Sequence, residues 1–202
     1  MPPTRPRLRQ RYDRRREEVI ETCAGVFAER GYQATTVQDL VRATGLAAGG
    51  LYHYIGSKQE LLFRILDQLM EPLLEEAQGV ERDGGEPVEQ LRRILRLWLV
   101  HIERHQSHML VFSQERHVVE REPGWQRVRE RRDAFEAILA RRVDAIRPEG
   151  SAEGQDRRLT LLALLGMVNY TPQWFQPGGR LTAEQIADRY CDMILAALGN
   201  YT

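Results

Sequence analysis

The sequence has almost no lysine, although it is not poor in positive charge. Of its 29 cationic side chains, 28 are arginines and a single one, Lys58, is a lysine. A lysine ammonium is a compact point charge, whereas an arginine guanidinium is a planar fork. Lys58 therefore marks a position suited to a point-like phosphate contact. The alternative is a chance lysine on a solvated surface.

Cysteines are also scarce, and long apolar runs are missing. Cys23 and Cys191 lie far apart, without C-x-x-C spacing and among apolar helical positions, so we expect reduced, buried thiols. No apolar run reaches the roughly 18 to 20 residues that span a bilayer. The arginine-rich start is not followed by the apolar segment of a secretory signal. We therefore expect a cytoplasmic protein without a membrane partner.

Strand patterns are absent as well. Leucine, alanine, arginine and glutamate recur with a spacing near that of an α-helix, and short β-branched alternations do not occur. The contents of 42% hydrophobic and 29% charged residues are ordinary for a globular protein. The sequence therefore predicts an all-α fold of about nine helices.

The net charge of zero conceals an asymmetry along the chain. Residues 1–58 carry ten cations against six acids, so the remainder is net acidic. Among the first sixteen residues, seven arginines face one acid, Asp13. We interpret residues 1–13 as a flexible basic arm that neutralises phosphates. The alternative is a solvated tail without a partner.

Residues 14–60 predict a three-helix helix-turn-helix domain. Thr36 and Asp39 have the spacing of a capping box at the start of a short helix. Gly45 ends that helix, and a second short helix follows from Ala47 or Ala48. Two short helices with a glycine between them are typical of a helix-turn-helix, whose second helix enters a major groove of DNA.

The same segment resembles the DNA-binding signature of the tetracycline-repressor (TetR) family. The resemblance rests on GYQATTVQDL from Gly31 to Leu40, on A-x-G-L-x-x-G-x-L-Y-x-Y from Ala43 to Tyr54, and on the SKxxLL run that starts at Ser57. It implies phosphate contacts from Thr36, Tyr52, Tyr54 and Lys58, and groove contacts from Ala47, Ala48, Gly50 and His53. We add Arg14 and Arg15 to this DNA-binding set. The family usually has Ser or Thr near position 47 and an aromatic residue at position 55, where this chain has Ala47 and Ile55.

Residues 61–202 predict a helical domain for effector binding and dimerisation. The most apolar stretch, residues 156–175, leaves little polar face, so we expect its helix to be buried on more than one side. Together with the last helix it predicts a four-helix bundle formed with a second copy, and hence a homodimer.

Residues 166–180 resemble the corresponding segment of TetR-type regulators that sense acyl-coenzyme A thioesters. The predicted effector-binding residues are Trp98, Met109, Phe112, Met167, Asn169, Tyr170 and Trp174. Arg104 or Arg180 is a candidate to meet coenzyme phosphates. Alternatively, the aromatic residues close the core or the dimer interface.

No metal, cofactor or catalytic site is predicted. His101, His105 and His108 share a helical spacing but lack an evident further ligand, and no nucleophile elbow or phosphate-binding loop occurs.

We expect a ligand-responsive repressor that binds a pseudo-palindromic double-stranded DNA operator as a dimer. A small apolar effector, an acyl-coenzyme A thioester of lipid catabolism, is expected to release it. The alternatives are an efflux-gene regulator that senses a hydrophobic drug, a small helical thioesterase or hydrolase, and an architectural DNA-binding protein without an effector.

Overall fold

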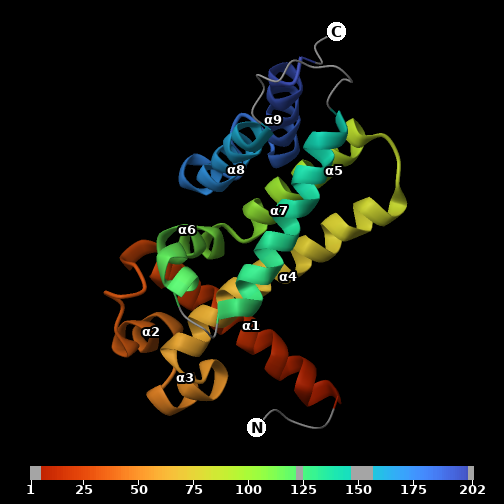
Figure 1. Ribbon diagram of the computed structural model, residues 1–202. Helices are drawn as coiled ribbons and strands as arrows, with labels where there is room; N and C mark the ends of the chain where they lie inside the picture. Colours follow the sequence, from red (N-terminus) through yellow and green to blue (C-terminus); the bar gives the residue numbers. More distant parts are fainter. Residues whose placement is uncertain (1–5, 122–124, 147–156, 200–202) are drawn as a thin grey trace. The chain divides into compact units, whose positions relative to one another are not determined.

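The computed structural model describes residues 6–121, 125–146 and 157–199, which form nine helices and no strand. The predicted all-α fold is therefore confirmed (Figure 1). The turn expected at residues 123–124 and the loop expected at residues 148–154 lie outside the described residues. The helices are α1 (Pro6–Arg30), α2 (Val37–Thr44), α3 (Ala48–Ile55), α4 (Lys58–Asp83), α5 (Pro87–Arg104), α6 (Gln106–Arg121), α7 (Gln126–Ile146), α8 (Arg157–Trp174) and α9 (Ala183–Ala197).

The chain divides into two compact units. The first unit comprises the residues up to Leu69 together with Ser107–Gln126, and the second comprises Met70–Gln106 and Arg127 onward. The sequence predicts a domain boundary between residues 60 and 61, which would place α6 in the second domain. Instead α6 belongs to the first unit, where the Gln114 side-chain amide donates to the Ala28 carbonyl at 3.1 Å. A contact across 86 residues leaves no mark on a local sequence pattern.

The core of the first unit forms where α1, α2 and α3 pack against one another. From α1 it takes a helical stripe of apolar side chains, and each of the two short helices adds leucine or isoleucine. The beginning of α4 completes it with four more aliphatic residues. The buried side chains are Val19, Ile20, Cys23, Ala24, Phe27, Leu40, Leu51, Ile55, Leu61, Leu62, Ile65 and Leu66.

The first helix begins earlier than the sequence predicts. Helix α1 is continuous from Pro6, so the expected flexible arm of residues 1–13 is corrected for residues 6–13, while residues 1–5 are not described. The physical reason is Tyr12, whose ring stacks on that of Tyr54 with centroids 5.3 Å apart. Its hydroxyl donates to the His53 carbonyl at 3.2 Å. This tertiary contact gives the charged helix end an anchor on α3.

In the second unit, α5 packs on α9 and both contact α8. Arg96 donates to both carboxylate oxygens of Asp188, at 2.7 and 2.9 Å. Arg92 donates to Asp192 at 2.9 Å. The hydrogen bonds from Arg96 lower the pKa of Asp188 most, with a smaller contribution from Arg92. These paired charges fix the position of α9 along α5.

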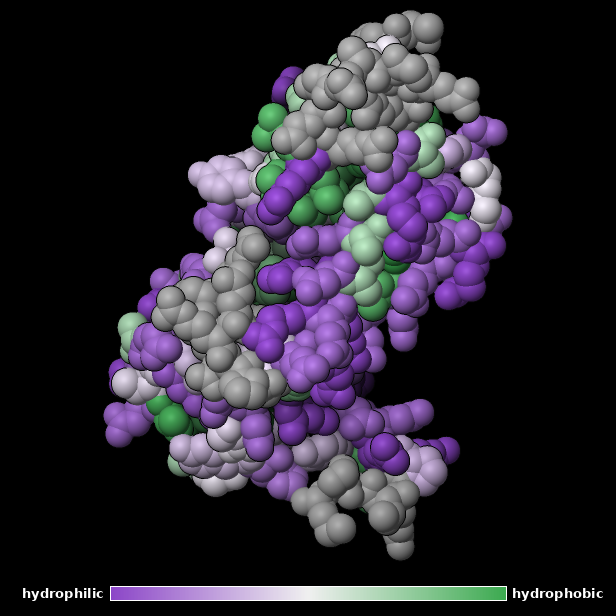
Figure 2. All heavy atoms as spheres, viewed as in Figure 1, coloured by the Kyte–Doolittle hydropathy of each residue, from purple (hydrophilic) through white to green (hydrophobic). Residues whose placement is uncertain are grey.

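Helix α8 exposes one of its faces in the single chain. Leu164, Leu165 and Val168 are buried, whereas the opposite face carries exposed apolar side chains, which we call the α8 stripe: Leu159, Leu162, Tyr170 and Trp174. Hydrophobic side chains reach the visible surface in the region of α8 and α9 (Figure 2). The expected burial on more than one side therefore does not occur within one chain.

Among the described helices, none combines the length and the apolar character that crossing a membrane requires.

Both cysteines are free and fully buried. Burial raises the pKa of Cys23 to about 12 and that of Cys191 to about 11. Because the thiolate is the reactive form, we expect neither thiol to react with Ellman's reagent in the native protein at mildly alkaline pH. Both should react after denaturation. Rapid labelling of the native protein would contradict this burial.

Candidate DNA-binding interface

Helix α2 begins with the capping box that the sequence predicts. The Thr36 hydroxyl oxygen accepts from the Asp39 backbone N–H at 3.2 Å, and the Asp39 carboxylate accepts from the Thr36 backbone N–H at 2.9 Å. At the other end, Gly45 has a φ of 66° in the left-handed region and returns its N–H to the Val41 carbonyl. This turn requires glycine, and it directs the chain into α3.

The capping carboxylate gives a test of pH dependence. The pKa of Asp39 is lowered, first by the hydrogen bond from the Thr36 hydroxyl, then by that from the Thr36 backbone, and further by Arg30 and Arg42. A lowered pKa in the folded state stabilises the fold above the unfolded-state pKa, and this contribution is lost as the pH falls through the folded value. Asp39→Asn should therefore lower the free energy of unfolding at neutral pH. Urea titrations should show the difference between the two proteins shrinking in acid; a constant difference would contradict the assignment.

Helix α3 presents a surface of small residues together with Tyr52 and His53. Leu51 and Ile55 are buried against α1 and α2, which leaves the opposite face to solvent. Ala47 precedes the helix without a side-chain capping bond, and a Cβ placed on Gly49 would meet nothing within 4 Å. The backbone of this helix can therefore be approached closely, while few of its side chains can donate hydrogen bonds.

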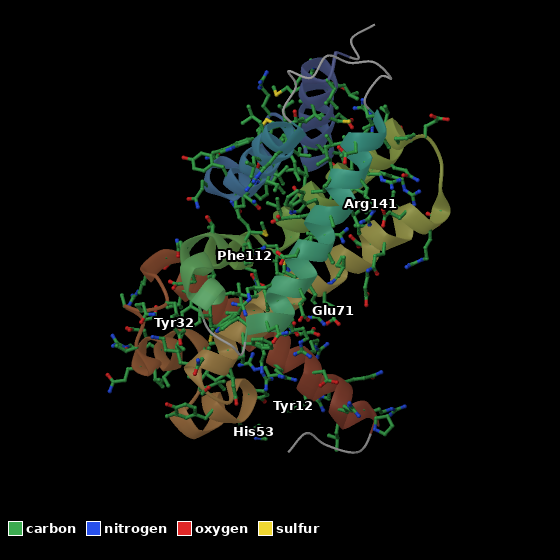
Figure 3. All side chains as sticks on the ribbon, viewed as in Figure 1. Tyr12, Tyr32, His53, Glu71, Phe112 and Arg141 are labelled. Carbon is green, nitrogen blue, oxygen red and sulfur yellow. The ribbon has the colours of Figure 1, made fainter. Side chains whose placement is uncertain are left out.

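An aromatic cluster holds the carboxyl end of α3. The His53 ring lies edge-on to those of Tyr12 and Tyr54, with centroids 5.4 and 5.5 Å away. Figure 3 shows Tyr12 of α1 beside His53. Because Tyr12 binds the backbone carbonyl of His53, the imidazole of this exposed residue remains available. His53 and Tyr54 were predicted from the sequence as site residues, whereas Tyr12 was missed.

A second capping box connects α3 to α4. The Ser57 hydroxyl oxygen accepts from the Glu60 backbone N–H at 3.0 Å, and the Glu60 carboxylate accepts from the Ser57 backbone N–H at 3.2 Å. This carboxylate folds over Gly56, whose φ of 76° is in the left-handed region. A Cβ on Gly56 would overlap the Glu60 carboxylate oxygen. The turn that fixes the start of α4 therefore depends on glycine.

The single lysine lies at the start of α4, over an aromatic ring. The Lys58 ammonium is 4.4 Å from the centroid of the Tyr32 ring, a cation–π geometry. The Tyr32 backbone N–H donates to the carboxylate of Glu115 at 3.2 Å, and Glu115 is only 5% exposed. Partial burial lowers the pKa of Lys58, which the charge of Glu115 opposes. Tyr32 and Glu115 were not predicted from the sequence because this contact joins residues 83 positions apart.

The remaining predicted DNA-binding residues lie on exposed positions of the first unit. Thr36, Ala48 and Tyr52 are exposed and Gly50 is half-buried. Arg14 and Arg15 are exposed on α1, and Arg15 forms an ion pair with Glu18 at 2.9 Å.

The predicted effector-binding residues are divided between the two units. Met109 and Phe112 are buried in the first unit, and Trp98 is buried in the second. The others are all in α8 of the second unit: Met167 and Asn169 are half-buried, and Tyr170 and Trp174 are 66% and 48% exposed. The last two thus lie on the α8 stripe.

The Trp98 indole has an unusual environment. Its ring lies edge-on to Phe135, with centroids 4.9 Å apart. The side chain is 4% exposed, and its ring N–H has no hydrogen-bond partner among the described residues. A buried donor without a partner is costly.

The second unit also contains a hollow of about 240 Å³ that is bounded by helices α4, α5 and α9. Arg104, a predicted candidate for coenzyme phosphates, lines it together with Arg96 and His101. None of the seven predicted effector-binding residues does. Arg180 is exposed in the segment between α8 and α9.

The three histidines considered as metal ligands do not all belong to one unit. His101 and His105 lie in the second unit with ring centroids 4.6 Å apart. Burial lowers the pKa of His105, and the charge of Arg104 lowers it further. His108 lies in the first unit, where its Nδ1 is 3.3 Å from a carboxylate oxygen of Glu21. The expectation of no metal site stays a prediction.

Two family models match most of this sequence. The model for bacterial regulatory proteins of the tetR family matches residues 19–65, and that for a tetracyclin repressor-like C-terminal domain matches residues 84–198. The transcriptional repressor KstR2 of Mycobacterium tuberculosis (strain H37Rv) is 27% identical over 189 residues, which cover 91% of this chain and 92% of the relative.

Solved structures are similar over most of their length. The ketosteroid transcriptional regulator KstR2 of Mycobacterium tuberculosis has a TM-score of 0.83 at 26% identity, covering 91% of this chain and 94% of that one. The TetR family regulator PfmR from Thermus thermophilus has a TM-score of 0.74 at 30% identity, covering 88% and 97%. AibR, in complex with isovaleryl coenzyme A and operator DNA, has a TM-score of 0.73 at 28% identity, covering 93% and 100%.

Proposed function

We propose that this chain, which belongs to the TetR family of transcriptional regulators, is a ligand-responsive repressor. In this proposal it binds a pseudo-palindromic operator as a homodimer. The observation that carries the proposal is the exposed face of α3, which follows a capped α2 and a left-handed turn at Gly45. The relatives that match over most of their length are named as repressors. We propose no enzymatic activity.

In this proposal α3 enters the major groove. Ala47, Ala48 and Gly50 allow close approach of the backbone, and His53 supplies base contacts. The surrounding phosphates are bound by Arg14, Arg15, Thr36, Tyr52, Tyr54 and Lys58. Because α3 offers few side-chain donors, the shape of the DNA should contribute much of the specificity.

Replacing His53 tests the base contact. We expect His53→Ala to reduce discrimination between selected and scrambled duplexes by about 1 to 3 kcal/mol at one base pair of each half-site. The selected duplex comes from enrichment of a random-sequence library on the wild-type protein. The fold should be retained, because the hydrogen bond from Tyr12 to the backbone carbonyl of His53 and the stacking of Tyr12 on Tyr54 do not need the imidazole. Unchanged discrimination, measured by fluorescence anisotropy, would remove His53 from the reading face.

Dimerisation is proposed to bury the α8 stripe together with the exposed Met193 of α9. Exposed apolar patches of this kind mark interaction surfaces, and a two-fold axis would place the same stripe on both sides of the interface. Gly166 lies on the same helix, and a Cβ added there would meet nothing within 4 Å. A partner helix can therefore approach closely. Tyr170 and Trp174 then have a place in the interface as well as the effector-binding role predicted for them.

The proposed effector is an acyl-coenzyme A thioester. Its support is the similarity to AibR, which was solved with isovaleryl coenzyme A, and the resemblance of residues 166–180 to acyl-coenzyme A sensors. In the second unit, the buried Trp98 adds an N–H without a partner among the described residues, beside an aromatic surface, which suits the acyl chain and the thioester carbonyl of such a ligand. We propose that the effector binds more tightly to a dimer conformation in which the two recognition helices no longer match the spacing of the half-sites. Its binding then lowers the affinity of the dimer for DNA. Met167 and Asn169 of the second unit remain proposed contacts, and the effector-binding role of Met109 and Phe112 stays a prediction.

Effector binding is tested by native mass spectrometry of the purified protein, followed by release of the selected duplex with a chain-length series of acyl-coenzyme A thioesters. We expect a bound thioester and release at a preferred chain length. Trp98→Phe, which keeps an aromatic ring and removes the N–H, should weaken the response without weakening DNA binding. Release by hydrophobic cationic drugs, with no response to thioesters, would favour the efflux alternative.

A further inference from the structure

We propose that the first turns of α1 form a second DNA contact, fixed in position by Tyr12, that binds backbone phosphates flanking the site entered by α3. This inference rests on the proposed function, since it assumes that α3 binds DNA. It differs from a flexible basic tail because the arm would meet the duplex at one defined place. We call Arg7, Gln10, Arg11 and Arg14 the α1 ridge.

The α1 ridge is a continuous cationic face. Its residues have the spacing i, i+3, i+4 and i+7, which places them on one side of a helix. All four are exposed, and together they line an open hollow of about 450 Å³. In Figure 2 the visible surface around the N-terminal part of α1 is mostly hydrophilic. The face that carries Tyr12, Val19 and Cys23 lies on the other side of the helix and packs inward.

The charges of the ridge are not neutralised within the described part of the chain. Two acids of this stretch pair with arginines outside the ridge: Asp13 with Arg9 and Glu18 with Arg15. Arg7, Arg11 and Arg14 form no ion pair with a described residue. Arginines four apart on a helix repel each other. A polyanion along this face would replace that repulsion by attraction.

Tyr12 fixes the ridge relative to the recognition helix. It touches α3 through the His53 carbonyl and through the Tyr54 ring. A helix rises about 1.5 Å per residue, so Arg7 and Arg14 are about 10.5 Å apart along its axis. One DNA strand offers a phosphate about every 3.4 Å along the duplex axis. The ridge is therefore as long as roughly three phosphate intervals of one strand. Its attachment to α3 favours duplex DNA over other anionic partners.

The test compares two arginine triples. In Arg7→Gln/Arg11→Gln/Arg14→Gln the ridge loses its charge. The control, Arg82→Gln/Arg93→Gln/Arg141→Gln, removes the same charge from exposed positions of the second unit. Affinity is measured against salt concentration on two forms of the selected duplex, one with long flanks and one trimmed to the half-sites. For the ridge variant we expect the slope of log affinity against log salt concentration to decrease in magnitude by about 0.9 per lost phosphate contact. The change should be larger on the long duplex than on the trimmed one, where only the Arg14 contact is lost. The control should keep the wild-type slope.

Two tyrosine variants separate position from charge. Tyr12→Ala keeps every arginine, yet it should remove the affinity gain of the long duplex and the protection of flanking phosphates in ethylation interference. Tyr12→Phe keeps the stacking on Tyr54 and should lie between it and the wild type.

The outcomes distinguish this inference from the proposed function. If the wild-type protein selects no duplex, the proposed function fails. If it selects one but the ridge variant keeps the full slope, or both triples lose it equally, the ridge makes no specific contact. Retention of flank protection in Tyr12→Ala would show that the arm is not positioned by Tyr12. Equal loss on long and trimmed duplexes would move the contact inside the half-site.

Discussion

Leu162→Glu is expected to convert the dimer into monomers and to lower operator affinity by at least about 100-fold, which corresponds to roughly 2.7 kcal/mol. Leu162 is 52% exposed in the single chain, so the change should leave the fold of the protomer intact. In the proposed dimer the two-fold axis would bring one new carboxylate from each copy into an apolar interface. Burying unpaired charges is costly.

The loss of operator affinity follows from the loss of the second half-site. Two linked recognition helices bind their half-sites with a high effective concentration, whereas a monomer binds one half-site alone. Sedimentation velocity gives the oligomeric state, and anisotropy with the selected duplex gives the affinity. Ala137→Glu, which adds the same charge at an exposed position of α7, should remain dimeric. A Leu162→Glu protein that stays dimeric would exclude the α8 stripe as the interface.

Gly56→Ala is expected to lower the free energy of unfolding by about 1 to 3 kcal/mol from backbone strain alone. The added Cβ also overlaps the carboxylate of Glu60, so the capping box at Ser57 must open. Because this turn joins α3 to α4, displacement should move Tyr54 and Lys58 apart and weaken DNA binding as well. Urea unfolding and anisotropy measure the two effects.

Gly25→Ala is the matched control. Gly25 lies inside α1, and a Cβ there would meet nothing within 4 Å outside the helix's own backbone. Alanine is favoured over glycine in a helix interior by up to about 1 kcal/mol, so this variant should be more stable than the wild type. Equal destabilisation by both substitutions would show that the conformation of Gly56 is not the cause.

Local chemistry in the sequence predicts much of this fold. The capping box at Thr36 and the end of α2 at Gly45 occur as expected. Each depends on residues only a few positions apart, so a sequence pattern can report it. The start of α1 and the placement of α6 depend on contacts such as those of Tyr12 and Gln114, which no local pattern contains.

The candidate DNA-binding site was likewise predicted from the sequence only in part. The motif residues of α2 and α3 identify the exposed face and its histidine. Tyr12 and Glu115, which support it, come from other parts of the chain and lie outside those motifs, and Tyr32 lies in the GYQATTVQDL run without having been predicted as a site residue. Lys58 was predicted both from its rarity in the composition and from its place in the SKxxLL run, and its phosphate contact stays a prediction.

We propose that two protomers joined through the α8 stripe bind one operator together. The most direct measurement is the mass of the complex between the protein and the selected duplex, by sedimentation equilibrium, with each half-site scrambled in turn. We expect dimers on the intact duplex and a large loss of affinity when either half-site is scrambled. One protomer per duplex, or an affinity that ignores the second half-site, would contradict it.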